Sequence, residues 1–231
     1  MLEEPPLIQI RTDAHKLRPS AAQIAAFRDV PTGNICDALG GTGALDMAIK
    51  PLPGCPAQFC GPALTVDCGP ADILALVAAL PEIAAGDVVL QTVAGHQGCA
   101  AIGDLVSGMV KNCGAVAVVT DGPARDLAAI TALDFPVFAT GINPNSPFGK
   151  GPGRIGHPII IGGRHVETGD IVKGDRDGVV TIPFARIDAT IAALADVTRA
   201  EAAKEAEVKA GLKWDKAIDD LHASGQVRRA P

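Results

Sequence analysis

The feature that most constrains the fold of this chain is a short, uninterrupted run of β-prone residues near its middle. Residues 115–119 read Ala-Val-Ala-Val-Val, without the polar alternation of a half-exposed strand, which is typical of a strand buried on both faces. Residues 100–112 before it carry apolar side chains at helical spacing, and Gly114 stands where a helix C-cap is expected. A turn at 121–124 follows the run. This alternation of helix and buried strand predicts an α/β fold.

Similar patterns continue along the rest of the chain. Ser20 and Gln23 have the spacing of a capping box, which predicts a helix from this point to Arg28. Other helices are expected over 33–39 with Thr32 as its cap, 71–80, from Arg125 onward, 186–208 and 213–223. Other strands are expected over 63–68, 88–90, 136–139, 158–161, 164–167, 171–173 and 179–182. The strands on either side of Gly162-Gly163 are expected to form a β-hairpin, and residues 141–156 a long ordered loop. We expect one domain over residues 1–231, with 1–30 as an N-terminal arm and helix and 186–231 as C-terminal helical appendages.

Composition and charge narrow the classes of protein. Hydrophobic residues make up 48% of the chain and charged residues 20%, so a sizeable core is expected and disorder is not. A net charge of -6, 3% aromatic residues and no Tyr speak against a nucleic-acid-binding surface. The sequence has neither an apolar run of the ~20 residues that span a bilayer nor the basic, apolar start of a signal peptide. A soluble cytoplasmic protein without nucleic-acid or membrane partners is therefore expected.

The first group of residues with chemical potential is Asp121-Gly122-x-x-Arg125-Asp126, which follows the buried strand. In open α/β sheets, ligands bind beyond the carboxyl ends of the strands. At such a place Asp126 can bind a hard cation, and Arg125 can hold a carboxylate or enolate oxygen. The alternative, which spacing alone favours, is that Asp126 caps the helix and Arg125 pairs with a surface carboxylate.

The second group is the glycine-bearing loop 95–99, which runs into the predicted helix with Asp104 one turn inside it. Backbone N–H groups and the helix dipole at such a start suit an anionic carboxylate or phosphate. A cation between Asp104 and the anion explains a carboxylate here, and a solvated Asp104 explains it equally well. The spacing is not that of a nucleotide-binding loop. His96 can act as an acid or base, or hydrogen-bond within its own loop.

Several segments match one family together, although each is weak alone. They are Cys36-Asp37-Ala38-Leu39, Gly103-Asp104, the run from Gly114 to Asp126, Phe135 to Ala139, and the run from Val166 to Pro183. In this combination the chain resembles the RraA-like family, which includes the class II 4-hydroxy-4-methyl-2-oxoglutarate / 4-carboxy-4-hydroxy-2-oxoadipate aldolases. The resemblance covers roughly residues 30–205.

The resemblance implies a swivelling β/β/α domain, with sheets and helices in layers, that assembles as a homotrimer or hexamer. It also implies a divalent cation, Mg²⁺ or Mn²⁺. Asp126 would be the direct ligand of this cation, and Asp104 would hold water molecules around it.

The resemblance further assigns the substrate contacts. Arg125 would stabilise the keto or enolate oxygen of a small 2-oxo acid. The backbone amides that would hold the pyruvyl carboxylate are those around Gly98, Ala100, Ala101 and Ile102. A glutamate from the C-terminal helix of a neighbouring subunit often completes such sites, and Glu201 is the candidate in this chain.

The implied reaction is cleavage of a 4-hydroxy-2-oxo acid to pyruvate and a second oxo acid, as in aromatic catabolism. Cleavage of the C3–C4 bond leaves an enolate, whose charge the cation and Arg125 would stabilise, while a base takes the proton of the C4 hydroxyl. Oxaloacetate decarboxylation passes through the same enolate. One site is therefore expected to catalyse both reactions.

One segment departs from the family pattern. The aldolases often carry Asn and His on the helix after the early strand, whereas residues 71–77 read Ala-Asp-Ile-Leu-Ala-Leu-Val. This departure affects the expected binding of the substrate end that lies away from the enolate-forming centre. The alternatives are a non-catalytic regulator that binds ribonuclease E and a related decarboxylase that acts on a different oxo acid. The joint presence of Asp104, Arg125 and Asp126 favours the enzyme.

Overall fold

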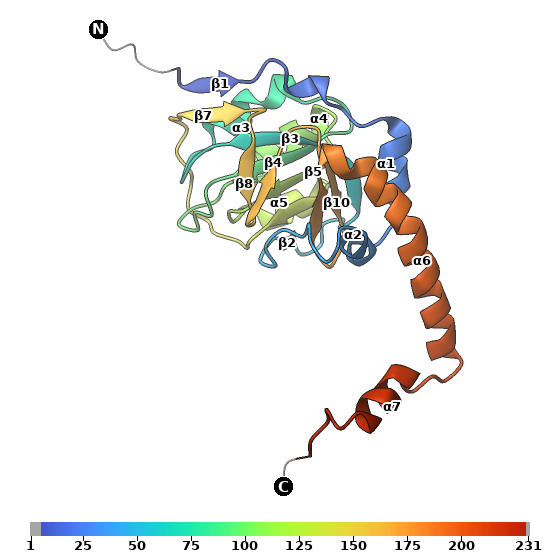
Figure 1. Cartoon of the computed structure of the whole chain (residues 1–231). Coiled ribbons are helices and arrows are strands. Elements are labelled where there is room, and N and C mark those ends of the chain that lie inside the picture. Colours follow the sequence, from blue (N-terminus) through green and yellow to red (C-terminus); the bar gives the residue numbers. More distant parts are fainter. Residues whose placement is uncertain (1–5, 230–231) are drawn as a thin grey trace.

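The computed structural model describes residues 6–229 as a layered α/β body from which a C-terminal helix projects (Figure 1). The central layer contains four parallel strands that lie side by side in the order of the sequence. They are β3 (Phe59–Asp67), β4 (Val88–Thr92), β5 (Ala117–Thr120) and β6 (Val137–Ala139). Every residue of β5 is buried, which confirms the prediction of a strand covered on both faces.

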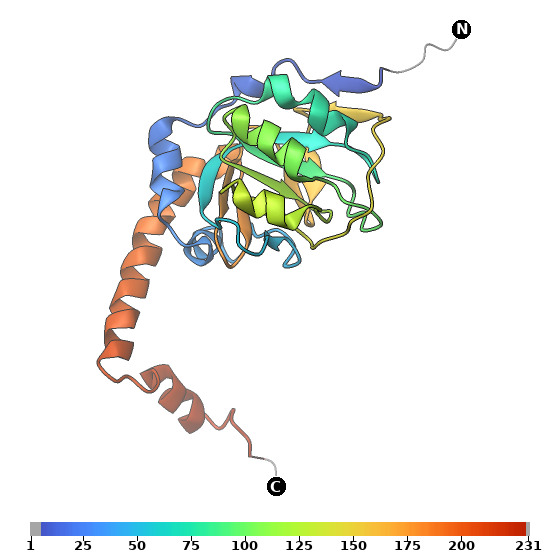
Figure 2. The same ribbon diagram turned by 180° about the vertical axis from the view of Figure 1, so that it is seen from behind.

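Helices cover one face of this sheet. They are α3 (Leu74–Ala78), α4 (Asp104–Asn112) and α5 (Leu127–Ala132), which follow β3, β4 and β5 in turn and lie together on that face (Figure 2). Val89 and Val118 of the strands pack in one buried cluster with Leu76, Val110 and Ile130 of the helices. Burial of these aliphatic side chains is the main source of stability on this side.

Short strands cover the other face. They are β8 (Ile159–Ile161), β9 (Arg164–Val166), β10 (Ile171–Gly174) and β11 (Val179–Ile182). β8 and β9 form the predicted hairpin, and β10 pairs with both β11 and the first half of β3. Leu90 and Val119 of the central sheet pack in a second cluster with Ile159 and Ile161. Two β layers and one helical layer confirm the β/β/α architecture.

The remaining elements lie at the edges and ends. β7 (Gly153–Ile155) pairs with β3, β1 (Ile8–Ile10) with β7, and β2 (Lys50–Pro51) with β6. Short 3-10 helices span Ala14–Lys16, Leu80–Glu82 and Phe184–Arg186. Within residues 6–229, no helix is long and apolar enough to cross a membrane.

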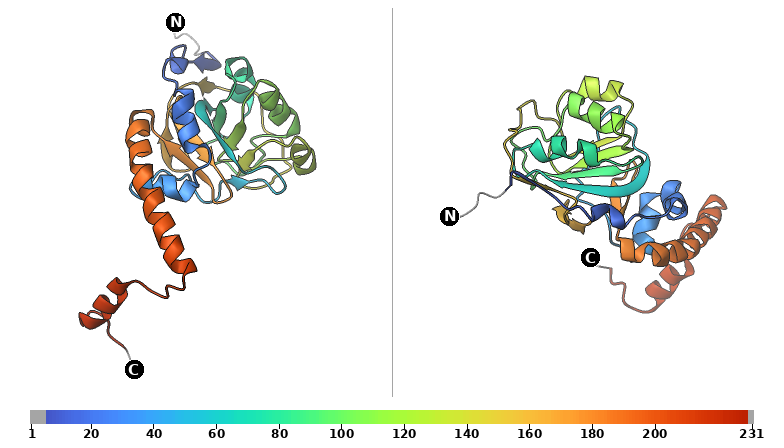
Figure 3. Two further views of the ribbon diagram at one scale, coloured as in Figure 1. Left: turned by 90° about the vertical axis from the view of Figure 1, so that its right-hand side faces the viewer. Right: turned by 90° about the horizontal axis from the view of Figure 1, so that it is seen from above.

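The N-terminal helices pack against the start of the long C-terminal helix. These helices are α1 (Ala21–Arg28), α2 (Thr32–Ala38) and α6 (Ile187–Lys209), and α7 (Lys216–Ala223) follows them. Phe27, Ile35 and Ile187 share a third buried cluster. Residues 198–229 are exposed, and Figure 3 shows this part of the chain extending away from the body. The predicted C-terminal helical extension is thus present.

Thr32 does not cap its helix with its own side chain, contrary to the expectation. It is the first residue of α2, and both its backbone N–H and its hydroxyl donate to the carboxylate of Asp175, at 2.8 Å each. Burial alone would raise the pKa of the Asp175 carboxyl, but these hydrogen bonds and one from the Asp177 amide lower it below its usual value. The turn after β10 therefore caps a helix that lies 143 residues earlier.

Replacing Asp175 by Asn is expected to lower the free energy of unfolding at pH 7 by about 1–3 kcal/mol, because a buried charged acceptor is lost. The folded-state pKa of Asp175 lies below its unfolded value. Its contribution is thus present above the unfolded pKa of about 3.9 and is lost as the pH falls through the folded pKa. Urea unfolding at neutral and acid pH measures both effects.

The matched control is the exposed Asp177→Asn, which is expected to leave stability unchanged. A difference between wild type and Asp175→Asn that persisted undiminished in acid would contradict this role of the carboxylate.

Candidate active site

The loop between β4 and α4 and the turn between β5 and α5 lie side by side at the carboxyl edge of the parallel strands. The N–H of Ala101 donates to the carbonyl of Pro123 at 2.7 Å, and the N–H of Arg125 donates to the carbonyl of Ile102 at 3.0 Å. These bonds hold residues 100–102 in an extended path, so α4 begins at Asp104 and not at residue 100. They also bring the starts of α4 and α5 together.

Gly103 is the point where the two helix starts meet. A Cβ atom placed on Gly103 would lie 2.8 Å from Oδ2 of Asp126 and 3.2 Å from Nε of Arg125. The approach is possible because this position, the N-cap of α4, has no side chain. Arg125 and Asp126 therefore lie against the N-terminus of the helix that Asp104 opens.

Asp126 holds a backbone conformation that is unfavourable for most residues. It is the N-cap residue of α5 with φ 60° and ψ 42°, in the left-handed region, and its side chain makes no capping hydrogen bond. Its Oδ2 lies 3.2 Å from Nε of Arg125, with both side chains partly exposed. The helix-capping alternative for Asp126 is thus not what the structure shows. The helix was predicted to begin at Arg125, but α5 begins two residues later, at Leu127.

Asp104 is the first residue of α4 rather than a residue one turn inside it. Its side chain is half-buried, and within residues 6–229 its carboxylate has no hydrogen bond or ion pair. The N–H of Ser107 makes the first intrahelical bond, to Gly103, at 3.0 Å. The amides of the first turn before Ser107 thus have no intrahelical acceptor and, with the helix dipole, favour an anion.

Two of the backbone amides assigned to the substrate carboxylate already have partners. The N–H of Ala100 donates to the carbonyl of Asn145 at 2.9 Å, and that of Ala101 donates to Pro123. The expectation that these two amides hold a ligand is therefore corrected. The assignments of Gly98 and Ile102 stay predictions. The first turn of α4 is the better donor of N–H groups to an anion.

Residues 141–152, here called the crossing segment, run over the starts of these helices from β6 to β7. The side-chain amides of Asn143 and Asn145 donate to the carbonyls of Gln97 and Gly98, at 2.9 and 3.0 Å. Nη1 of Arg125 donates to the hydroxyl of Ser146. The sequence predicted only an ordered loop here. The sequence Asn-Pro-Asn-Ser at 143–146 could have indicated these bonds, because Asn and Ser side chains often hydrogen-bond to nearby backbone.

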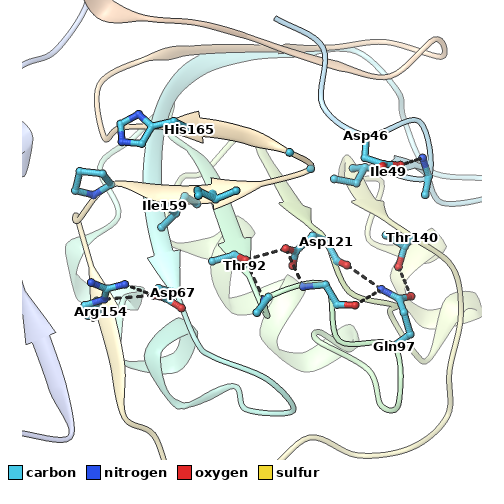
Figure 4. A pocket seen from close by; sticks show the side chains of 17 residues that line it. Asp46, Ile49, Asp67, Thr92, Gln97, Asp121, Thr140, Arg154, Ile159 and His165 are labelled. Atoms are coloured by element: carbon cyan, nitrogen blue, oxygen red, sulfur yellow. Dashed lines mark hydrogen bonds and ion pairs between the residues drawn. The ribbon is translucent and has the colours of Figure 1, made fainter.

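A separate pocket of about 820 Å³ lies between the β8–β9 hairpin and the carboxyl ends of the strands (Figure 4). The carboxylate of Asp121 borders it and accepts from Thr92 Oγ1 at 2.8 Å and from the amides of Val93 and Gly95, at 2.7 and 3.1 Å. The residues that line the pocket include neither Arg125 nor Asp126. Asp121 thus fixes the loop before α4 and borders this pocket, whereas Arg125 and Asp126 do not line it.

Gln91 is a supporting residue that sequence reasoning missed. It is fully buried in β4, and its Nε2 donates to the carbonyl of Ala101 at 3.0 Å. Within the described part of the chain its Oε1 has no partner, a costly arrangement for a buried oxygen. A polar residue inside an otherwise aliphatic strand was the available signal. Its amide helps to fix the loop that leads to Gly103.

Two further residues named from the sequence, His96 and Glu201, have contacts other than the charged pair. The ring of His96 packs on its own loop, since a Cβ atom on Gly98 would lie 2.7 Å from its Nε2. The carboxylate of Glu201, on the exposed part of α6, accepts from the side-chain amide of Asn34. A role for Glu201 in the site of a neighbouring subunit stays a prediction.

The carboxylates near the start of α4 suit a hard cation that keeps part of its water shell. Within residues 6–229, no three His, Cys, Asp or Glu side chains are grouped as a complete metal cage. Mg²⁺ keeps several of its water molecules and is commonly held by one or two carboxylates together with substrate oxygens. Asp126 and Asp104, neither of which is used in helix capping, offer such carboxylates. A structural zinc site would instead need four Cys or His ligands.

Comparison with known proteins identifies the family. The model of the RraA-like family, described as Aldolase/RraA, matches residues 32–181. The chain belongs to the RraA-like family. Among curated members, a protein of Halalkalibacterium halodurans named "Putative 4-hydroxy-4-methyl-2-oxoglutarate aldolase" is 41% identical over 160 residues, which cover 69% of this chain and 76% of that protein.

Solved structures show the same RraA-like fold. RraAS2 of Streptomyces coelicolor, described as an unusual member of the RNase ES inhibitor RraA protein family, aligns with a TM-score of 0.72 at 25% identity, over 82% of this chain and 100% of that one. An uncharacterized protein of Pseudomonas syringae aligns with a TM-score of 0.72 at 22% identity, over 85% of this chain and 96% of that one. The second likeness shows the fold alone.

Proposed function

We propose that the chain is a divalent-metal-dependent lyase that cleaves a 4-hydroxy-2-oxo acid to pyruvate and a second oxo acid. Substrates of this class include 4-hydroxy-4-methyl-2-oxoglutarate and 4-carboxy-4-hydroxy-2-oxoadipate. The observation that carries the proposal is the meeting of Arg125 and Asp126 with the open N-terminus of α4. The similarity to the Halalkalibacterium protein supports it. The proposed cofactor is Mg²⁺ or Mn²⁺, and the proposed assembly is a homotrimer or hexamer.

Each residue has a role that its position supports. The guanidinium of Arg125, steadied by Ser146 and Asp126, donates to the keto oxygen that gains charge as the enolate forms. The first-turn amides of α4 hold the neighbouring carboxylate. Asp104, unpaired beside them, accepts the proton of the C4 hydroxyl through a water molecule. A divalent cation at Asp126 and Asp104 would supply further stabilisation of negative charge on the substrate oxygens.

The test is release of pyruvate from 4-hydroxy-4-methyl-2-oxoglutarate and from oxaloacetate, with Mg²⁺ and with EDTA. We expect release from both in the presence of Mg²⁺ and none with EDTA, because both reactions need the same enolate. Release from oxaloacetate alone would keep the enolate chemistry and assign a different natural substrate. No release from either by a folded sample supplied with Mg²⁺ would refute the proposal.

A second candidate function is regulation of a ribonuclease. The likeness to the Streptomyces structure, described as belonging to an RNase inhibitor family, is the observation that favours it. Inhibition of ribonuclease E by this chain, together with no pyruvate release, would assign the regulatory function in place of the lyase.

A further inference from the structure

The pocket of about 820 Å³ between the β8–β9 hairpin and the carboxyl ends of the strands, here called the hairpin pocket, has no part in the proposed lyase reaction. Its volume lies within the range of about 300–1,000 Å³ that is typical of small-molecule sites. Ala94, Gln97, Arg154 and Ile160 are exposed members of its lining, so a ligand can enter from solvent. The chemistry of this lining indicates which ligand it would take.

Asp121 brings a buried carboxylate to the hairpin pocket. The residue is only 8% exposed, and both of its carboxylate oxygens accept hydrogen bonds, from Thr92 Oγ1 and from the amides of Val93 and Gly95. These donors are neutral, and among the side chains that the structure describes no Lys, Arg or His pairs with Asp121. Aspartate is seldom buried to this extent without a positive partner. Its uncompensated charge attracts a cation more strongly here than it would in bulk water.

The other charged side chains of the pocket favour a cation as well. Nη2 of Arg154 donates to Oδ2 of Asp67 at 2.7 Å, so this arginine is already neutralised. Asp46 is exposed, and its carboxylate accepts from the amide of Ala48 at 2.8 Å. His165 is the other basic side chain of the lining and is exposed. With this histidine counted as neutral, the lining has two carboxylates without a counter-charge and no free cationic group for an anion.

The walls of the pocket suit an organic cation better than a metal ion. No three His, Cys, Asp or Glu side chains are grouped as metal ligands in the part of the chain that the structure describes. Much of the lining is apolar instead, with the buried Ile49 and Ile159 beside Ala48 and Pro158. In Figure 4 the hairpin strand that carries Ile159 lies opposite the strand ends that carry Thr92 and Asp121. A ligand with one charged end and one apolar end matches these two sides.

We propose that the hairpin pocket binds a small organic cation in which a primary ammonium group is joined to an apolar body. A carboxylate has about four acceptor positions, so Asp121, with three donors already bound, can accept one more hydrogen bond, from the ammonium. The apolar body packs against Ile49 and Ile159. Arg125 and Asp126 do not line the pocket, so this inference goes beyond the proposed function and does not depend on it.

The experiment is a titration of the full chain, labelled at the isoleucine methyl groups, followed by NMR. The probes are benzylamine, benzyl alcohol and benzoate, which share one ring and differ in charge. Benzylamine is protonated at neutral pH, and we expect it to bind about 10- to 100-fold more tightly than the other two, the value of one charged hydrogen bond. It should shift the methyl signals of Ile49 and Ile159, each assigned from its Ile→Val variant. Ile35 and Ile130, which belong to other buried clusters, should not shift.

Three variants test the assignment of the charge and of the pocket. Asp121→Asn keeps an acceptor for the loop amides and removes the charge, so it should abolish the preference for benzylamine over benzyl alcohol. Ala48→Phe places a large side chain at an exposed position of the lining and should prevent binding of benzylamine. The exposed Asp220→Asn on α7 removes one charge outside the pocket and should change nothing.

Several results would overturn the proposal. They are a wild-type protein that binds none of the probes, one that binds benzylamine no more tightly than benzyl alcohol or benzoate, and shifts that miss Ile49 and Ile159. An undiminished preference in Asp121→Asn, or undiminished binding to Ala48→Phe, overturns it too. Circular dichroism identifies a variant that does not fold. If Asp121→Asn is such a variant, the three probes on the wild type and Ala48→Phe decide. Pyruvate release does not enter this experiment, so failure here is distinct from failure of the lyase proposal.

Discussion

Replacing Asp126 by Gly is expected to abolish metal-dependent pyruvate release while leaving the fold as stable as before. Asp126 holds φ at 60°, where glycine is not strained, and its side chain makes no capping bond that α5 could lose. The free energy of unfolding should be unchanged or up to about 1 kcal/mol higher. The value of kcat/KM for pyruvate release should fall by about 1,000-fold or more, because the carboxylate proposed to hold the cation beside the developing enolate is removed.

Asp134 supplies a matched control for this variant. It is also an aspartate in the left-handed region, with φ at 47°, and it lies exposed just beyond the end of α5. Asp134→Gly should change stability in the same direction and leave activity intact. Urea unfolding and pyruvate release measured on both variants provide the comparison. Full activity of Asp126→Gly would remove Asp126 from the site.

Replacing Gly103 by Ala is expected to disturb the site through one methyl group. The new Cβ would lie 2.8 Å from Oδ2 of Asp126 and within 3.3 Å of two atoms of Arg125, so these side chains must move. Displacements of this kind cost about 100-fold in rate when they misplace a catalytic group by about 1 Å. The backbone of Gly103, with φ at -131°, accepts alanine without strain. Only about 1 kcal/mol of stability should be lost, from the weaker N-cap.

Gly108, one turn further along α4, provides the comparison for Gly103. Its Cβ would meet only a side-chain carbon of Leu133 at 3.8 Å, an ordinary contact. Gly108→Ala should therefore stabilise the helix by about 0.5–1 kcal/mol and leave kcat/KM unchanged. Steady-state kinetics and thermal unfolding of both variants test the pair. If Gly103→Ala were as active as Gly108→Ala, the contact between the two helix starts would have no role in catalysis.

Local sequence patterns predicted the elements whose causes are local. The capping box at Ser20 and Gln23, the buried run around Val118 and the hairpin at Gly162-Gly163 all depend on residues close in sequence, and each is present. The beginning of α4 was misplaced by four residues because the path of residues 100–102 is set by hydrogen bonds to the distant turn at Pro123. The cap of α2 was misassigned for the same reason, since Asp175 supplies it from far along the chain.

The position of the charged residues of the candidate site could be predicted from the sequence, whereas the loop contacts that hold them could not. Arg125 and Asp126 follow a buried strand, so their place at the carboxyl edge of the sheet follows from the fold class. The use of the Ala101 amide by another loop, the support from Gln91 and the path of the crossing segment depend on tertiary contacts between loops. Loop geometry of this kind has no periodic signal in the sequence.

The most direct test of the enolate-forming site is exchange of the C3 protons of pyruvate in D₂O, followed by proton NMR. This reaction needs no distal carboxylate and no cleavage, so it depends on the groups that stabilise the enolate alone. We expect the wild-type protein with Mg²⁺ to catalyse the exchange, and Asp126→Gly or EDTA to stop it. Absence of exchange in the folded, Mg²⁺-supplied wild type, or undiminished exchange in Asp126→Gly, would contradict the account.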